Sequence, residues 1–264
     1  MGDASLHHRV IAFNTATAST NKIHDDDVAR ALGFRGGLVP GVDVYAYLCH
    51  LPAARWGRDW LAGGAIDARF ESPVYDGDEV RIDGELDGDH TIRLDLRDPS
   101  GASCAVGRAA LLSSPPTVDV GAWPQTAPAP DEPPPVSAEA LTSRPLGSIA
   151  ATFHAERAVD YLDDVREDLA LFRDDGLAHP GWLLRYANYV LSANVRLGPW
   201  IHVASRVQLL HPVADGDLVE TRASVLDVSE RRGHHFVELD VLQIVGDRPV
   251  TRTAHTAIYR PRGT

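Results

Sequence analysis

An internal repeat constrains the fold of this chain more than any other feature of its sequence. The segment PVYDGDEV at residues 73–80 recurs as PVADGDLV at residues 212–219, and GLVPG at residues 37–41 recurs as GLAHPG at residues 176–181. The two offsets are 139 and 140 residues. Because two separate motifs keep nearly the same spacing, we predict a tandem duplication of a unit of roughly 110 residues.

The hydropathy pattern predicts the same order of elements in each copy. The first copy begins with a strand over residues 9–14, a short helix over 25–32, a glycine-rich loop over 33–40 and a longer helix over 41–51 that ends at Pro52. Alternation of apolar and polar residues then predicts strands over residues 80–86, 92–96 and 105–112. The second copy repeats this order with a helix over 182–195 and strands over 203–210, 218–228, 235–244 and 250–259.

One helix followed by antiparallel strands, present twice, predicts an α+β fold. In the second copy an apolar helix face suits a helix wrapped by a sheet, and it is formed by Leu183, Leu184, Ala187, Val190 and Leu191. A sheet curled around one long helix is the hotdog fold, so we expect a double hotdog whose two sheets pair edge to edge. We place the N-terminal hotdog unit at residues 1–114, a Pro-rich linker at 115–147 and the C-terminal hotdog unit at 148–264.

The charge of the chain narrows the class of partner. It has 25 basic and 37 acidic residues, which gives a net charge of -12. Nucleic-acid and anionic-membrane partners are therefore not expected, because both require a positive face. No apolar run approaches the ~20 residues of a membrane span, and the N-terminus does not resemble a signal peptide, so we expect a cytoplasmic protein.

We expect neither a metal nor a cofactor. The two cysteines, Cys49 and Cys104, cannot form a zinc site, and the histidines do not occur at metal-ligand spacing. The glycines of residues 33–37 fail the dinucleotide-binding pattern because no βαβ unit precedes them.

The segment NKIH at residues 21–24, together with Ala29 and GFRGGLVPG at residues 33–41, resembles the signature of the MaoC-like dehydratase family, which includes the R-specific enoyl-CoA hydratases. That signature reads Asp-x-Asn-Pro-x-His, followed by a small helix, a Gly-Phe loop and a glycine at the start of the hotdog helix. A Pro-Val-x-x-Gly-Asp-x-Val block, present in both copies, is also typical of the family. The resemblance covers residues 8–112 and 148–262.

The residues of the signature are only partly present. The family's asparagine falls on Asn21 and its histidine on His24, whereas its catalytic aspartate falls on Ser19 and its proline on Lys22. The family's usual histidine before the helix glycine falls on Pro40. The second copy has no Asn-x-x-His, so the resemblance places the active site in the first copy, without the family's Asp–His pair.

The resemblance implies a hydratase or dehydratase that adds water to a 2-enoyl thioester or removes it from a 3-hydroxyacyl thioester, in fatty-acid or polyketide metabolism. The substrate would be an acyl-CoA or an acyl-carrier-protein thioester. His24 would be the acid/base residue, Asn21 would orient it, and the backbone N–H of Gly41 would stabilise the oxyanion. Ser19 would contact the substrate.

The acyl chain is expected to pack against the second copy, near Trp182, Arg185 and Asn188. In the family a serine near the substrate often occupies the position of Ser205.

Two other function classes stay open. Asp43, two residues into the first helix, could serve a hotdog thioesterase as nucleophile or base, although aspartate is also common there for capping reasons. The replacement of the catalytic aspartate by Ser19 could instead mark a non-catalytic acyl-binding protein. A homodimer of double hotdogs is left open as well.

Overall fold

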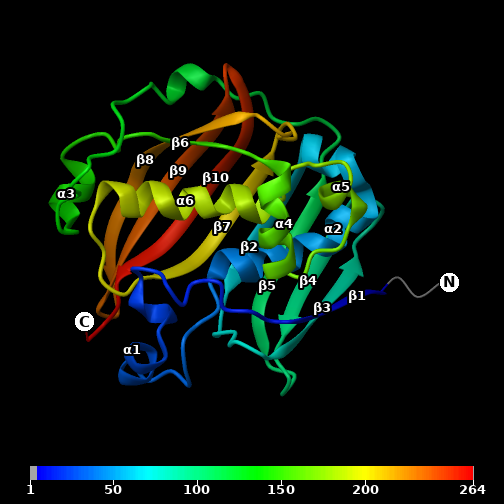
Figure 1. Ribbon diagram of the computed structural model, residues 1–264, viewed down its shortest axis with the longest axis horizontal. Coiled ribbons are helices and arrows are strands. Elements are labelled where there is room, and N and C mark those ends of the chain that lie inside the picture. The colour runs from blue at the N-terminus through cyan, green and yellow to red at the C-terminus, as the bar shows by residue number, and fades with distance from the viewer. Residues whose placement is uncertain (1–4, 264) are drawn as a thin grey trace.

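The computed structural model describes residues 5–263, and its strands form one antiparallel sheet. Ten strands follow the spatial order β1-β3-β4-β5-β2-β7-β10-β9-β8-β6 (Figure 1). The strands of the first half are β1 (Ser5–Ile11), β2 (Gly64–Phe70), β3 (Glu79–Leu86), β4 (Thr91–Arg97) and β5 (Ser103–Leu111). Those of the second half are β6 (Ile149–Thr152), β7 (Ile201–Leu209), β8 (Leu218–Arg231), β9 (His234–Val245) and β10 (Arg248–Arg260).

The two halves join where β2 pairs with β7. This antiparallel pairing runs from Ala65 opposite Gln208 to Arg69 opposite Ala204. Without it, each half would expose a strand edge with unpaired backbone groups. The α+β double hotdog with one continuous sheet, expected from the repeat, is therefore confirmed.

Two long helices, α2 (Gly41–Gly63) and α6 (Pro180–Asn194), pack against each other and against the sheet. Figure 1 shows both helices on the same face of the sheet. Tyr45 and Leu48 of α2 and Val190 and Leu191 of α6 are wholly buried and belong to the main hydrophobic core. Gly41 begins α2 and Gly181 is the second residue of α6, so both glycines lie at helix N-termini, as the repeat predicts.

The prediction that α2 ends at Pro52 is wrong. Pro52 lies inside the helix, and the backbone leaves the helical conformation only at Gly57, where φ is 56° and ψ is -136°. Glycine adopts this conformation without the steric penalty of other residues. The segment beyond Pro52 stays helical because it carries Trp60 and Leu61 into the core. Burial of two large apolar side chains, at about 1.5–3 kcal/mol each, offsets the roughly 3 kcal/mol that an internal proline costs.

The sequence pattern does not predict β2 or β6. β2 (GAIDARF) directly follows a helix and begins with small residues, and β6 (IAAT) has only four residues. Pairing stabilises both: β2 lies between β5 and β7, and β6 pairs with β8. Sheet context here outweighs local propensity.

Short helices precede each long helix. η1 (Lys22–His24) and α1 (Asp26–Ala31) precede α2, and the Asp25 carboxylate caps α1 by accepting hydrogen bonds from two of its backbone N–H groups. α4 (Ala155–Asp164) and α5 (Ala170–Arg173) precede α6. None of the helices in the described part of the chain is long and apolar enough to cross a membrane.

The connection between the halves packs on the second half. It contains η2 (Val120–Ala122) and α3 (Ala138–Thr142). Trp123 is buried against Leu242 and Ile244 of β9, and its Nε1 donates to the carbonyl of Asp240. The unit boundaries at residues 114/115 and 147/148 stay a prediction.

Candidate functional site at the N-terminus of α2

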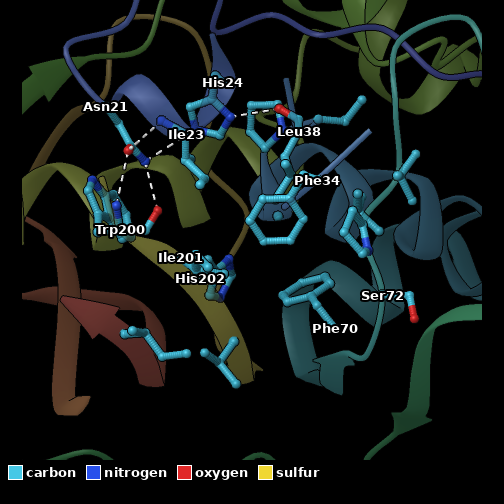
Figure 2. A pocket seen from close by; sticks show the side chains of 18 of the residues that line it. Asn21, Ile23, His24, Phe34, Leu38, Phe70, Ser72, Trp200, Ile201 and His202 are labelled. Carbon is cyan, nitrogen blue, oxygen red and sulfur yellow. Dashed lines mark hydrogen bonds between the residues drawn. The ribbon is translucent and has the colours of Figure 1, made fainter. Parts of the chain in front are cut away.

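A cavity of about 240 Å³ lies at the N-terminal end of α2. Both halves line it: the η1 segment and residues 38–41 come from the first half, and residues 200–203 come from the second. Phe34, Phe70 and Ile201 belong to its apolar wall, and Asn21, His24 and His202 lie around it as polar groups (Figure 2). A mostly apolar cavity with a few convergent polar groups is typical of a small-ligand site. We call it the first cavity.

The side chain of His24 has a defined tautomer. Its Nδ1 lies 2.7 Å from the carbonyl oxygen of Leu38, and because a carbonyl only accepts, Nδ1 carries the proton. Nε2 therefore carries the lone pair. Burial lowers the pKa of His24 below its ordinary value, against opposing effects of the Leu38 hydrogen bond and the Asp43 carboxylate. His24 is thus neutral at pH 7 and can act as a base.

Asn21 positions His24 and connects the two halves. Its Oδ1 accepts hydrogen bonds from the N–H of Trp200 at 3.2 Å and of Ile23 at 3.3 Å, and its Nδ2 donates to the Trp200 carbonyl at 3.0 Å. These bonds fix the orientation of the amide, so Nδ2 also donates toward Nε2 of His24, 3.3 Å away. That contact is long for a hydrogen bond, so a water molecule can replace it at Nε2.

The N-terminus of α2 is uncapped where it meets the first cavity. Its N-cap residue, Pro40, makes no side-chain hydrogen bond to the first turn. The first amides of a helix lack intrahelical acceptors, and the helix dipole adds positive potential there. Gly41 lines the cavity, and a Cβ atom on it would lie 3.0 Å from Nδ1 of His202. Glycine is therefore needed for this close packing, and it leaves room for a carbonyl oxygen to approach the helix end.

Beside Gly41 lies a buried series of polar side chains of which the sequence analysis identifies only Ser205. Nε2 of His202 lies 2.8 Å from Oγ of Ser205, which lies 3.0 Å from Nδ1 of His255. His202 and Ser205 belong to β7 and His255 to β10. The sequence feature that could have indicated this series is a histidine among apolar residues in each of two strands, β7 and β10, that pair in the sheet. The series is not predictable from the sequence, because Ser205 and His255 are 50 residues apart and come together only through the pairing of β7 with β10.

A second cavity, of about 380 Å³, adjoins the first. Ser19 and Arg185 line the second cavity, and Asn21, His24 and Asn188 line both. Ser19 Oγ accepts a hydrogen bond from the backbone N–H of Asn21 at 3.1 Å. Oδ1 of Asn188 is buried and has no hydrogen-bond partner among the residues that the structure describes. Four of the predicted site residues thus surround His24.

Asp43 is engaged in a buried ion pair. Its Oδ1 lies 2.8 Å from Nη2 of Arg185, and its Oδ2 accepts a hydrogen bond from the Thr15 hydroxyl at 2.6 Å. Although burial opposes it, the Asp43 carboxylate raises the pKa of Arg185 above its ordinary value. Asp43 lines neither cavity, so the structure does not bring this predicted site residue to the ligand space.

Trp182 is also outside both cavities, contrary to expectation. Its ring packs on Phe153 at a centroid distance of 5.0 Å and on Tyr186 at 4.7 Å. Trp182 packs against a hydrophobic cluster of the second half that includes Phe153, Ala158 and Leu183.

The equivalent helix end in the second half is closed. Nδ1 of His179 accepts a hydrogen bond from the backbone N–H of Gly181 at 3.0 Å, which caps α6. The Tyr161 hydroxyl lies directly against Gly181, and Cβ of Ala46 would lie 2.7 Å from a Cβ atom on Gly181. Protein atoms therefore occupy the space that corresponds to the first cavity, so the open helix end is the one of the first copy.

The cluster of His50, Glu167 and Asp168 has donor atoms close enough together to hold a metal ion. Oε1 of Glu167 lies 3.1 Å from Nδ1 of His50 and also accepts hydrogen bonds from the backbone N–H groups of Asp168 and Leu169, each at 2.9 Å. Burial alone would raise the pKa of Glu167, but hydrogen bonds with His179 and His50 lower it below its ordinary value. These bonds explain the buried carboxylate without a metal.

No protein-family model and no curated protein sequence matches the chain. A conserved hypothetical protein from Mycobacterium tuberculosis, described as having a double hotdog fold, superposes with a TM-score of 0.66 at 16% identity and covers 97% of this chain and 96% of its own.

Two further solved structures are similar over nearly their whole length. A MaoC-like dehydratase has a TM-score of 0.61 at 13% identity, with 97% of this chain and 98% of its own covered. A candidate thioesterase from Novosphingobium aromaticivorans has a TM-score of 0.58 at 12% identity, with 99% and 98% covered. This protein therefore has the double hotdog fold that structures described as dehydratases and as thioesterases share.

Proposed function

We propose that this protein is a hydratase or dehydratase of acyl thioesters and that its active site is the first cavity. The observation that carries the proposal is the position of a neutral His24, with its lone pair on Nε2, in the same small cavity as the uncapped end of α2. Water addition to an enoyl thioester requires a base near the β-carbon and hydrogen-bond donors at the carbonyl oxygen. This cavity offers both.

In this proposal His24 alone transfers the proton. Nε2 takes a proton from water while the water oxygen bonds to the β-carbon, and the electron pair of the double bond moves toward the thioester oxygen. The N–H of Gly41 and the dipole of α2 stabilise the resulting enolate. The His24 imidazolium then gives the proton to the α-carbon as the enolate collapses. One water has been added and His24 is neutral again, so the aspartate replaced by Ser19 is not required.

The geometry favours this reaction over hydrolysis of the thioester. A thioesterase using Asp43 would need its carboxylate at the ligand. Asp43 instead lies behind the wall of the second cavity, and its two carboxylate oxygens bond Arg185 and Thr15, which line that wall. The second cavity, with Asn188 and Arg185 in its wall, is the proposed place for the part of a CoA or carrier-protein thioester that extends beyond the first cavity.

The test is the hydration of crotonyl-CoA and trans-2-octenoyl-CoA, followed by loss of the enoyl absorbance, with release of free thiol measured in parallel. We expect hydration without thiol release, and a 10²–10⁴-fold lower kcat/KM in His24→Ala, the usual effect of positioned acid/base catalysis.

His211→Ala is the matched control, because Nδ1 of His211 also lies 2.7 Å from a backbone carbonyl, that of Pro249, but its side chain is exposed and outside both cavities. Thiol release alone would establish a thioesterase. The absence of both reactions would favour a non-catalytic acyl-binding protein.

A further inference from the structure

The buried series His202, Ser205 and His255 reaches the uncapped end of α2 from the second half of the chain. The three side chains are 6%, 3% and 1% exposed, in that order. Two ring nitrogens at the ends of the series, Nδ1 of His202 and Nε2 of His255, have no hydrogen-bond partner within residues 5–263. His202 lines the first cavity (Figure 2). Its Nδ1 is the atom that would lie 3.0 Å from a Cβ atom on Gly41.

The two histidines are neutral. Burial, with the adjacent His255, lowers the pKa of His202 well below its ordinary value. Burial likewise lowers the pKa of His255 to about 4. A neutral imidazole has one N–H donor and one bare acceptor nitrogen, so each hydrogen bond in the series has a direction.

Two arrangements of protons satisfy both hydrogen bonds of the series and also use the Ser205 hydroxyl proton, because a third, in which both histidines donate to Oγ, leaves that proton without an acceptor in the series. In one, His202 donates to Ser205 and Ser205 donates to His255, which leaves a protonated Nε2 of His255 buried without an acceptor. In the other, His255 Nδ1 donates to Ser205 and Ser205 Oγ donates to His202 Nε2. The proton of His202 is then on Nδ1, and the bare nitrogen without a partner is Nε2 of His255.

The second arrangement is the one that a ligand in the first cavity can complete. Each arrangement leaves one buried N–H without an acceptor among residues 5–263, on Nε2 of His255 in the first and on Nδ1 of His202 in the second, and such a group is costly. His255 lines neither cavity, whereas the His202 ring lines the first, so the second arrangement is the one in which a ligand oxygen can supply the acceptor.

We infer that His202 is a further catalytic residue, whose Nδ1–H donates a hydrogen bond to the thioester carbonyl oxygen beside the N–H of Gly41. The inference rests on the proposed function. No proton moves to or from His202 in this role; the hydrogen bond strengthens as the oxygen becomes an enolate and weakens as the enolate collapses. A neutral imidazole suits a polarising donor, because it does not lose its proton to the enolate.

Ser205 and His255 are positioning residues in this arrangement. They hold His202 in the tautomer that presents Nδ1–H, and they touch neither the substrate nor the reacting atoms. The active site is then built from both copies, with the base His24 from the first and the donor His202 from the second. Neither half of the chain contains the complete active site by itself.

A matched pair of variants tests the role of His202. Asparagine places an amide nitrogen near the position of Nδ1, whereas glutamine places one near Nε2 and leaves the Nδ1 position empty. Loss of one oxyanion donor lowers kcat by roughly 10²–10³-fold. We therefore expect that fall in His202→Gln on crotonyl-CoA, with KM changed less than about 3-fold, and at least a 10-fold higher kcat in His202→Asn than in His202→Gln.

The tautomer of His202 can be measured from the ¹⁵N NMR spectrum of the wild-type protein labelled at its histidine side chains. The signals of His202 are identified as those that are absent from the spectrum of His202→Asn. We expect a protonated Nδ1 and a bare Nε2 in His202. Addition of butyryl-CoA should shift the Nδ1 signal. Ser205→Ala should mix the two tautomers, and Ser205→Thr, which keeps the hydroxyl, should restore the single tautomer.

The outcomes separate the inference from the proposed function. If the wild type hydrates crotonyl-CoA and folded His202→Gln keeps its kcat within about 3-fold, His202 is not a catalytic residue while the proposed function stands. A His202→Asn variant no better than His202→Gln also overturns the donor role. If the wild type does not hydrate, the proposed function is wrong and the catalytic role of His202, which rests on it, falls with it. If the wild type hydrates but Nδ1 of His202 is bare or does not shift with butyryl-CoA, the inference alone is overturned.

Discussion

Substitutions in the Asp43–Arg185 pair distinguish a structural ion pair from a catalytic carboxylate. Asp43 is 0% exposed and the Arg185 side chain is 18% exposed. Removing one partner of a buried pair leaves an uncompensated charge and costs roughly 3–5 kcal/mol of unfolding free energy. We expect Arg185→Met to lie near the upper end of that range, because the remaining Asp43 is wholly buried. Asp43→Asn should cost less, because Arg185 reaches the second cavity.

The double variant D43N/R185M should be more stable than the sum of the single effects predicts. Both charges are then absent, so no buried charge is left unpaired. We expect a coupling free energy of at least about 2 kcal/mol, within the range measured for contacting groups. The assay is urea denaturation of the four proteins at pH 7, compared through the free energy of unfolding in water with the m-values unchanged.

The same variants test the role of Asp43 in catalysis. We expect folded D43N to hydrate crotonyl-CoA with a kcat/KM within about 3-fold of that of the wild type, because Asp43 does not act on the substrate in the proposed mechanism. A change no larger than this excludes the loss of a catalytic group. A D43N protein as stable as wild type but inactive would refute the reasoning. It would show that the carboxylate acts on the substrate, as a thioesterase mechanism requires.

Three further predictions follow from single features of the structure. Gly41→Ala should lower kcat/KM and cost less stability than Gly181→Ala, because its added methyl group presses on His202 at the cavity less closely than the methyl group of Gly181→Ala presses on Tyr161 and Ala46 in a closed region. Thermal unfolding and kinetics of both variants check this. In the pH profile of kcat/KM, the midpoint of the fall at acid pH should lie below pH 6.5, because His24 must be neutral to act as a base and its pKa is lowered. A midpoint at or above pH 6.5 would contradict the assignment of His24 as the base. The free energy of unfolding should be highest above about pH 6.5 and should fall toward pH 4, by about 3 kcal/mol for His255 alone. The reason is that between these pH values His255 binds a proton in the unfolded chain but not in the folded one. Urea denaturation at several pH values should show a weaker pH dependence of the unfolding free energy in His255→Phe.

The sequence predicts the fold well where the signal is repeated or local. Two motifs at nearly equal offsets predict the duplication, and the edge-to-edge pairing follows from the need to cover strand edges. The errors occur where tertiary packing overrides a local rule. Pro52 is a helix breaker by propensity, yet Trp60 beyond it is needed in the core. β2 has a weak strand sequence but lies between two partner strands.

The candidate site is predictable only in its local part. Asn21, His24 and Gly41 belong to the segment that resembles the MaoC-like signature, so the resemblance implies that they lie at one site. His202 and His255 reach the site through the pairing of β7 with β10 and the packing of β7 beside α2, which no local pattern encodes. The ion pair between Asp43 and Arg185 likewise joins residues 142 positions apart, so a structural role for Asp43 could not be separated from a catalytic one.

A structure of the protein with 3-hydroxybutyryl-CoA tests most directly whether the helix end of the first copy is the active site. We predict that the thioester carbonyl oxygen lies within hydrogen-bond reach of the Gly41 N–H, roughly 2.6–3.2 Å, and that the 3-hydroxyl lies at the same reach from Nε2 of His24. A thioester carbonyl at Gly181, with its hydroxyl more than ~8 Å from His24 and so beyond reach even through one water, would contradict the account.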